Sequence, residues 1–351
     1  MKKLLLILPL ALILCIIVGC QEGEEVAEEA GRVFKLEELS YTDVDDLDRE
    51  KTIFFMTFGN LEEHGPHLPL GSDYFQAIGV RDRLISRLYA VYSDYNFVSF
   101  PVVPIGEGGA GGLARQFDHI GDFMVRFETL RNLAIDLGVT IARKGFQNIF
   151  IIHSHGGPLH NVAFNDAAAF VSETYNIRMI HITGLVFGEG FYSEEVINKY
   201  LGEDWLEKYG MAGHACAAET SANLYLCGNL VKPVYKDLPP FVTKDFGEFL
   251  RAYERADWQG YWNAPAQASK EMGKELVDDF VERSFRIAQK ALAGEDLSTL
   301  PVYPANMPPM PEWNDLIEKE QEIYANQKAQ IEKWLKKRED DNAPSKHQDF
   351  N

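Results

Sequence analysis

The chain has 351 residues, of which 46% are hydrophobic, so it is long enough to bury a real core in one large domain or two modest ones. Its formal net charge of −19 at pH 7 argues against binding nucleic acid or anionic lipid, because like charges repel. The acidity favours a neutral or cationic small-molecule substrate. No segment repeats at a fixed period, which excludes a solenoid.

The N-terminal residues 1–19 are predicted to be a signal peptide. Lys2 and Lys3 precede the apolar run 4–18, which is too short and wrongly flanked for a membrane span. The small residues before Cys20 resemble the lipobox of bacterial lipoproteins. Cleavage before Cys20 and acylation of its thiol would anchor the protein firmly, so we expect an extracytoplasmic, membrane-anchored lipoprotein. An ordinary secretory signal cut elsewhere is the alternative.

The mature chain would carry 32 basic and 53 acidic side chains, a net charge of −21, because residues 1–19 hold two lysines and no acid. Residues 20–46 begin with an acidic run and are predicted to form a tether. Of the four cysteines, Cys216 and Cys227 would remain unmodified. Eleven residues apart on one predicted helix, they would be about 16 Å apart, so no disulfide is expected.

Between residues 47 and 295, strand-like and helix-like segments alternate. This order predicts a single α/β domain with a mostly parallel sheet and helices on both faces. Strands are expected at 52–58, 97–103, 148–152 and 178–182, with a late strand at 231–235. Helices are expected at 74–89, 123–144, 159–175, 193–209, 215–226 and 271–292.

Residues 296–351 are predicted to lie outside this domain. Repeated prolines after residue 300 indicate an extended connector. A charged helix at 313–338 follows, which could dock on a neighbouring subunit or cover its own domain. We expect docking, and hence a homo-oligomer, with a loose tail at 338–351.

A first group of candidate metal ligands follows the predicted strand 52–58. Glu62 and His64 are two residues apart on an extended segment, so their side chains point the same way. Glycines and prolines then turn the chain back, so that Asp73 can face them. Carboxylate and imidazole donors together suit Zn, Mn or Fe. The alternative is a strand-end turn with solvated charges.

A second group of candidate residues lies at the carboxyl end of the predicted strand 148–152. Ligands bind at the carboxyl ends of strands in open α/β sheets. His155 is the candidate ligand, and the following glycines permit close approach of a ligand. His153 is expected to be a core histidine or to support a ligand.

A third group, His214 and Glu219, stands near the start of the predicted helix 215–226. Small residues between them leave room for a ligand, and a helix N-terminus favours negative charge. The alternative is an ordinary helix start with Glu219 solvated.

The glycine run 106–112 lacks the Lys-Ser/Thr of a phosphate loop and is predicted to be a mobile active-site loop. Beyond it, Arg115 and His119 could contact the substrate or a metal ligand.

Together the three groups resemble the creatininase (creatinine amidohydrolase) family over roughly residues 50–290. Its motifs read roughly Glu-x-His-Gly-Pro-His-Leu-Pro-Leu-Gly-Thr-Asp, Asn-Gly-His-Gly-Gly-Asn and His-Ala-Gly-x-x-Glu-Thr-Ser. The first match is long, the third is good and the second is partial. The resemblance implies a three-layer α/β/α fold and a metal-dependent amidohydrolase that acts on a small-molecule amide. It implies that Glu62, His64, Asp73 and His155 bind metal. If two divalent ions are bound, Asp73 would bridge them.

The remaining roles are assigned by the same resemblance and by general chemistry. A bound metal would activate water to attack an amide or cyclic amide bond. Glu219 would complete a second metal site or accept the proton of the water, and His214 would protonate the leaving nitrogen. His67, in the same loop as His64, would support a ligand.

The chain also departs from the family pattern. Gly157 stands where the creatinine-cleaving enzyme has a metal-binding Glu, so one or two ions remain possible. Gly210 and the Trp-free segment 183–187 replace its pocket tryptophans, although Phe187, Phe191 or Trp205 could supply an aromatic wall. Creatinine is therefore not the expected substrate. The rival functions are a single-metal deformylase or small-peptide amidase, and a non-catalytic lipoprotein that binds a metal or solute.

Overall fold

A five-stranded parallel sheet forms the centre of the protein, in the order β1-β3-β2-β4-β5. The computed structural model describes residues 33–109, 120–306 and 311–340. The strands are β1 (Val33–Lys35), β2 (Thr52–Thr57), β3 (Asn96–Ser99), β4 (Asn148–Ile152) and β5 (Arg178–His181). Every residue of β2 and β4 is buried. Their near-continuous apolar runs fit strands that are covered on both faces.

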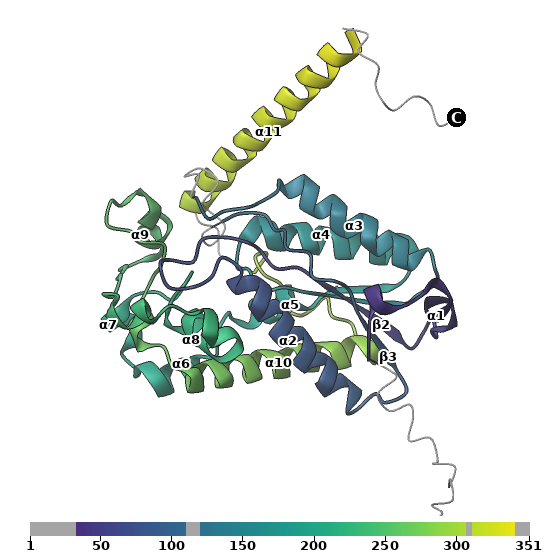
Figure 1. Ribbon diagram of the computed structural model, residues 1–351, viewed down its shortest axis with the longest axis horizontal. Coiled ribbons are helices and arrows are strands. Elements are labelled where there is room, and N and C mark those ends of the chain that lie inside the picture. Colours follow the sequence, from purple (N-terminus) through teal and green to yellow (C-terminus); the bar gives the residue numbers. More distant parts are fainter. Residues whose placement is uncertain (1–32, 110–119, 307–310, 341–351) are drawn as a thin grey trace, which may run out of the picture.

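Helices cover both faces of this sheet (Figure 1). Alternate strand residues face opposite sides: Phe54 and Ile149 pack with α3 (Phe127–Ala142) and α4 (Pro158–Tyr175). Phe55 and Phe150 face the second core. That core is closed by α2 (Ser72–Tyr89), α5 (Ile182–Glu189), α8 (Ala217–Cys227) and α10 (Lys270–Leu292). The three-layer α/β/α prediction is confirmed.

Further helices complete the described chain. They are η2 (Leu36–Glu38), α1 (Tyr41–Asp46), α6 (Glu194–Leu201), α7 (Trp205–Tyr209), η4 (Gly228–Leu230), η5 (Pro233–Asp237), α9 (Phe246–Leu250), η6 (Ala252–Glu254), η7 (Pro265–Gln267) and α11 (Pro311–Asp340). None of the helices in the described part of the chain is long and apolar enough to cross a membrane.

The predicted tether of residues 20–46 is wrong from residue 33 onward. Strand β1 pairs in parallel with β3, and Phe34 packs against the first core. Ser40 and Asp43 form a capping box that starts α1. The acidic composition of this segment favoured the prediction of a tether. Its few apolar side chains are nevertheless enough to hold it at the edge of the sheet. Residues 1–32, with Cys20, lie outside the described residues.

Several predicted boundaries also change. The predicted helix 193–209 is split into α6 and α7 at Gly202, whose φ of +91° a helix cannot accommodate. The predicted strand 231–235 is wrong, since Pro233 opens the 3-10 helix η5 and has no N–H for a sheet. Helix α5 was not predicted, because its run is apolar on all sides rather than on one.

The C-terminal region is not a free connector throughout. Tyr303 is 5% exposed, its N–H donates to the Gly184 carbonyl (3.0 Å), and its hydroxyl donates to the Gly156 carbonyl (2.9 Å). The predicted domain boundary at residue 295 is therefore too early. Helix α11 starts beside α9, and its Tyr324 hydroxyl donates to Glu107. The rest of α11 projects away from the domain (Figure 1).

Candidate metal centre

The predicted ligands meet at the carboxyl edge of the sheet. Glu62 and His64 lie in the loop after β2, and His155 lies in the loop after β4. The Glu62 N–H donates to the Leu70 carbonyl (3.0 Å), which folds the loop back so that Asp73, in the first turn of α2, faces it. Glu219 comes from the first turn of α8, with His214 just before that helix. All six side chains are buried.

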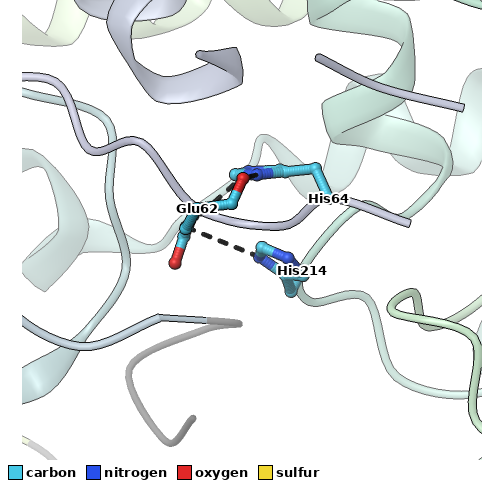
Figure 2. A group of neighbouring side chains, drawn as sticks. All are labelled: Glu62, His64 and His214. Atoms are coloured by element: carbon cyan, nitrogen blue, oxygen red, sulfur yellow. Dashed lines mark hydrogen bonds and ion pairs between the residues drawn. The ribbon is translucent and has the colours of Figure 1, made fainter. Parts of the chain in front are cut away.

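These six residues form three overlapping groups that could hold a metal ion. The groups are Glu62–His64–His214, Glu62–Asp73–His155 and His64–Asp73–Glu219. Within each group, the candidate ligand atoms lie within 4.8 Å of one another. Figure 2 shows the first group, in which both imidazoles approach the Glu62 carboxylate. The structure thus brings together every residue for which the sequence predicted metal binding.

Histidine–carboxylate pairs connect the three sequence motifs. His155 Nδ1 lies 2.9 Å from Glu62 Oε1 and 3.4 Å from Asp73 Oδ2. His64 Nε2 lies 3.7 Å from Glu62 Oε1 and 3.5 Å from Glu219 Oε1. His64 Nδ1 lies 3.1 Å from the Glu62 carbonyl oxygen, an acceptor that fixes the ring and leaves Nε2 facing the carboxylates.

The donor atoms of this cluster fit a divalent cation. Within the described residues, Glu62 Oε2, His64 Nε2 and Asp73 Oδ2 are buried and have no hydrogen-bond partner. Buried polar atoms without partners are costly, and cations held by the three overlapping groups would satisfy these atoms. Oxygen and imidazole donors suit Zn, Mn or Fe. The cluster is therefore a candidate site for one or two such ions.

The buried environment of the cluster favours the protonated forms of two of its residues. Burial raises the pKa of Glu62 to about 7, against the opposing effect of His155 and His214. Burial alone would lower the pKa of His64, but Glu219, Glu62 and Asp73 outweigh it and raise that pKa to about 10. A bound cation would displace these protons, since ligands bind metal in the deprotonated form.

His214 differs from the other histidines in its contacts. Its Nε2 lies 2.5 Å from the Glu63 carbonyl oxygen and 3.4 Å from Glu63 Oε1. Its Nδ1 lies 3.7 Å from Glu62 Oε1. Glu63 was not among the predicted site residues, although it stands between the candidate ligands Glu62 and His64.

The remaining candidates take positions around the cluster. His67 Nε2 lies 2.8 Å from the Thr220 hydroxyl, and burial followed by the charge of His64 lowers the pKa of His67 to about 4. His153 is in none of the three groups, and its Nε2 lies 2.7 Å from Nε2 of His181. His181 was not among the predicted site residues, because it belongs to no charged motif in the sequence and meets His153 only through the pairing of β5 with β4.

The predicted mobile loop is only partly described. Residues 106–109 are buried, and a Cβ on Gly106 would collide with Asn60, so this part of the loop is closely packed. Arg115 and His119 lie outside the described residues.

A cavity of about 280 Å³ opens beside the candidate ligands. Glu62, Asp73, His155, His214 and Glu219 line one end of it, and most of the other lining side chains are apolar. Concave sites with convergent polar groups are the usual sites of ligand binding.

The fold and the site together define an α/β protein with a candidate metal centre at the carboxyl edge of a parallel sheet. A family model described as creatininase, creatinine amidohydrolase, matches residues 37–288. Because the match spans most of the chain, the protein belongs to the creatininase family. The family and the candidate metal groups support a metal-dependent amidohydrolase.

Solved creatininase structures share the fold. The crystal structure of a creatinine amidohydrolase (creatininase) is 17% identical, with 73% of this chain and 97% of that chain covered and a TM-score of 0.55. A mutant creatininase of Zn–Zn type is 17% identical, covers 74% and 98% of the two chains and has a TM-score of 0.55. A creatininase described with Mn is 17% identical, with the same coverage and a TM-score of 0.54. No curated protein matches the chain in sequence.

Proposed function

We propose that the protein hydrolyses a C–N amide or cyclic amide bond in a small molecule, with water as the nucleophile and a divalent metal as cofactor. The observation that carries this proposal is the set of three overlapping ligand groups at one end of the cavity. A bound ion would lower the pKa of water toward about 7 and polarise the amide carbonyl. The known ions of solved creatininases, Zn and Mn, fit the same donors.

We assign two ions to this site. Glu62, Asp73 and His155 would hold the first, and His64, Asp73 and Glu219 the second. Asp73 is the residue common to both groups and would help to hold both ions. Glu219 would take the place of the ligand that Gly157 cannot supply. If a single ion is bound, Glu219 is instead available to accept the proton of the water.

His214 is assigned to the leaving nitrogen. It lines the cavity, and its ring is held through Nε2 by Glu63, so Nδ1 is left for a proton. Burial and His64 lower the pKa of His214, but Glu62 and Glu63 raise it above its ordinary value overall. Glu62 and Glu63 thus favour the protonated imidazole, which is the form that a proton donor needs.

Turnover of an amide panel tests this proposal. The mature protein, loaded with Zn or Mn, should hydrolyse at least one cyclic or linear amide, and chelation should abolish this activity. Asp73→Asn should be inactive, whereas Glu271→Gln, an exposed carboxylate change on α10, should be fully active. Hydrolysis limited to formamides or small peptides would favour the deformylase or peptidase rival. Metal binding without turnover of any amide would favour the non-catalytic lipoprotein.

We also propose that the enzyme is a membrane-anchored lipoprotein on the extracytoplasmic side, as the signal-like residues 1–19 and Cys20 predict. We further propose a homo-oligomer. The projecting part of α11 supports it, since Ile331, Trp334 and Leu335 are 41–58% exposed there. Light scattering of the protein and of Trp334→Glu tests this assembly: a smaller mass is expected for the variant.

A further inference from the structure

The cavity beside the metal-competent residues extends between α2, α5, α8 and α10 into an apolar chamber. Helix α2 contributes Val80, and α10 contributes Leu276, Val277 and Phe280. Helix α8 contributes Ala218 and Ala222, four residues apart and so on one face of the helix. Because both side chains are only methyl groups, they leave open a space in the chamber that larger side chains would fill. At about 280 Å³, the cavity exceeds the roughly 150 Å³ that is enough to hold a benzene ring.

An aromatic wall stands along this chamber. The rings of Phe187 and Phe191 are stacked, with centroids 4.4 Å apart. The ring of Tyr303 meets Phe191 edge-on at 4.9 Å, and Phe280 meets Phe187 edge-on at 5.8 Å. All four residues line the cavity. Rings arranged in this way offer both a face and an edge to a further planar or apolar group.

Tyr303 connects this wall to the candidate metal centre. Its hydroxyl donates to the carbonyl of Gly156, the residue after His155. Asn165 donates to the Tyr303 carbonyl (2.9 Å), which holds the segment against α4. Tyr303 lies beyond residues 37–288, the part of the chain that the family model matches. One of the four residues of the aromatic wall is therefore supplied by a segment outside the family match.

The apolar part of the chamber has no counter-charge for an anionic group. Among its described lining residues there is no lysine or arginine, and its carboxylates belong to the metal-competent end. A substrate carboxylate in the apolar part would be desolvated without a partner, which is costly. An uncharged apolar group would instead gain by leaving water.

We propose that the substrate is an uncharged amide that carries an apolar, ring-sized group next to its scissile bond, and that Phe187, Phe191, Phe280 and Tyr303 form the subsite that selects this group. This inference rests on the proposed function, because the metal-competent end must hold the amide for the apolar group to enter the chamber.

Hydroxamate binding tests the subsite without relying on turnover. Acetohydroxamate, phenylacetohydroxamate and 4-carboxyphenylacetohydroxamate are titrated calorimetrically into the Zn-loaded protein. The phenyl compound should bind roughly 10- to 150-fold more tightly than acetohydroxamate, the gain from full burial of a large apolar group. The carboxylated ring should lose most of this gain.

Variants test whether the preference for the phenyl compound arises from the proposed subsite. Phe191→Ala should reduce the phenyl-to-methyl affinity ratio by about 5-fold or more, and Ala222→Leu should bring it close to one by filling the chamber. Phe170→Ala, which removes a 46% exposed ring of α4 that is not a lining residue, should leave the ratio unchanged. Thermal unfolding of each variant verifies that it is folded.

The outcomes separate the two proposals. Equal affinity for the methyl and phenyl compounds, or no binding of the phenyl compound, overturns the subsite even if amides are hydrolysed. A ratio that is intact in Phe191→Ala and Ala222→Leu also overturns it. If the ratio behaves as expected and no amide is hydrolysed, the subsite stands and the proposed amidohydrolase activity fails.

Discussion

The Nε2 atom of His64 lies 3.5 Å from Oε1 of Glu219, and both side chains are buried. His64 comes from the loop after β2, whereas Glu219 comes from the first turn of α8. Asp73 completes the group that they form. This contact brings the Glu219 carboxylate to the metal-competent cluster, whereas Gly157, two residues after His155, has no side chain to contribute.

Glu219→Gln should lower the metal content from two ions per chain to one. The amide keeps the size of the side chain but is a much weaker ligand than a carboxylate for a divalent ion. Mass spectrometry of the dialysed protein measures the metal content, and Glu271→Gln serves as the matched control. Two ions retained in Glu219→Gln would show that other residues hold the second ion.

Asp73→Ala should remove more metal than any other single ligand change, because a shared carboxylate serves both ions. Metal content is compared across Glu62→Ala, His64→Ala, His155→Ala and Asp73→Ala. Asp73→Asn, which preserves the packing of α2 better, guards against loss of metal through misfolding. Full occupancy in both Asp73 variants would falsify the bridging assignment.

His214→Ala should retain the metal but lower kcat by roughly 10²–10⁴-fold, the usual span for a lost general acid or base. Added imidazole should restore part of the rate by supplying the missing proton donor. Figure 2 also shows the arrangement that would give the opposite result, with His214 beside Glu62 and His64. Loss of metal with an unchanged kcat per bound ion would make His214 a ligand.

Creatinine should be a poor substrate compared with an amide that bears an apolar ring. Phe187 and Phe191 do supply an aromatic wall, so the missing tryptophans alone do not exclude a flat ring. The apolar chamber beyond them gives the stronger reason, because a small polar ring would leave it largely unfilled. Competition between creatinine and phenylacetamide for the metal-loaded protein measures this preference. A kcat/KM for creatinine of about 10⁴ M⁻¹s⁻¹ or above, with no better amide, contradicts it.

Cys20→Ala should move the protein from the membrane fraction to the soluble fraction of the cell envelope, since the acylated thiol would be the anchor. Fractionation followed by immunodetection measures the distribution. Cys15→Ala, a cysteine change within the signal-like segment, is the control and should leave the protein in the membrane fraction. Membrane retention of Cys20→Ala would point to another anchor.

The three-layer fold and the residues of the candidate metal centre could be predicted from local sequence. The buried runs of β2 and β4 need no partner to be recognised, since strands covered on both faces are apolar throughout. Glu62, His64 and Asp73 occur within twelve residues, so their chemistry is visible in one loop. The edge strand β1 was missed because its three residues lie in an acidic stretch and gain their stability from pairing with β3.

Only the tertiary structure decided which residues surround the site. His181 meets His153 because β5 lies beside β4, and Tyr303 reaches Gly156 from beyond α10. Phe191 and Ala222 line the same chamber although neither belongs to a motif of charged residues. The reason is physical: a ligand set is marked by residue type and short spacing, whereas an apolar cavity arises from how distant helices pack around the space that their side chains leave. The sequence by itself therefore determined the chemistry at one end of the cavity, and the packing of α2, α5, α8 and α10 decided what can bind at the other.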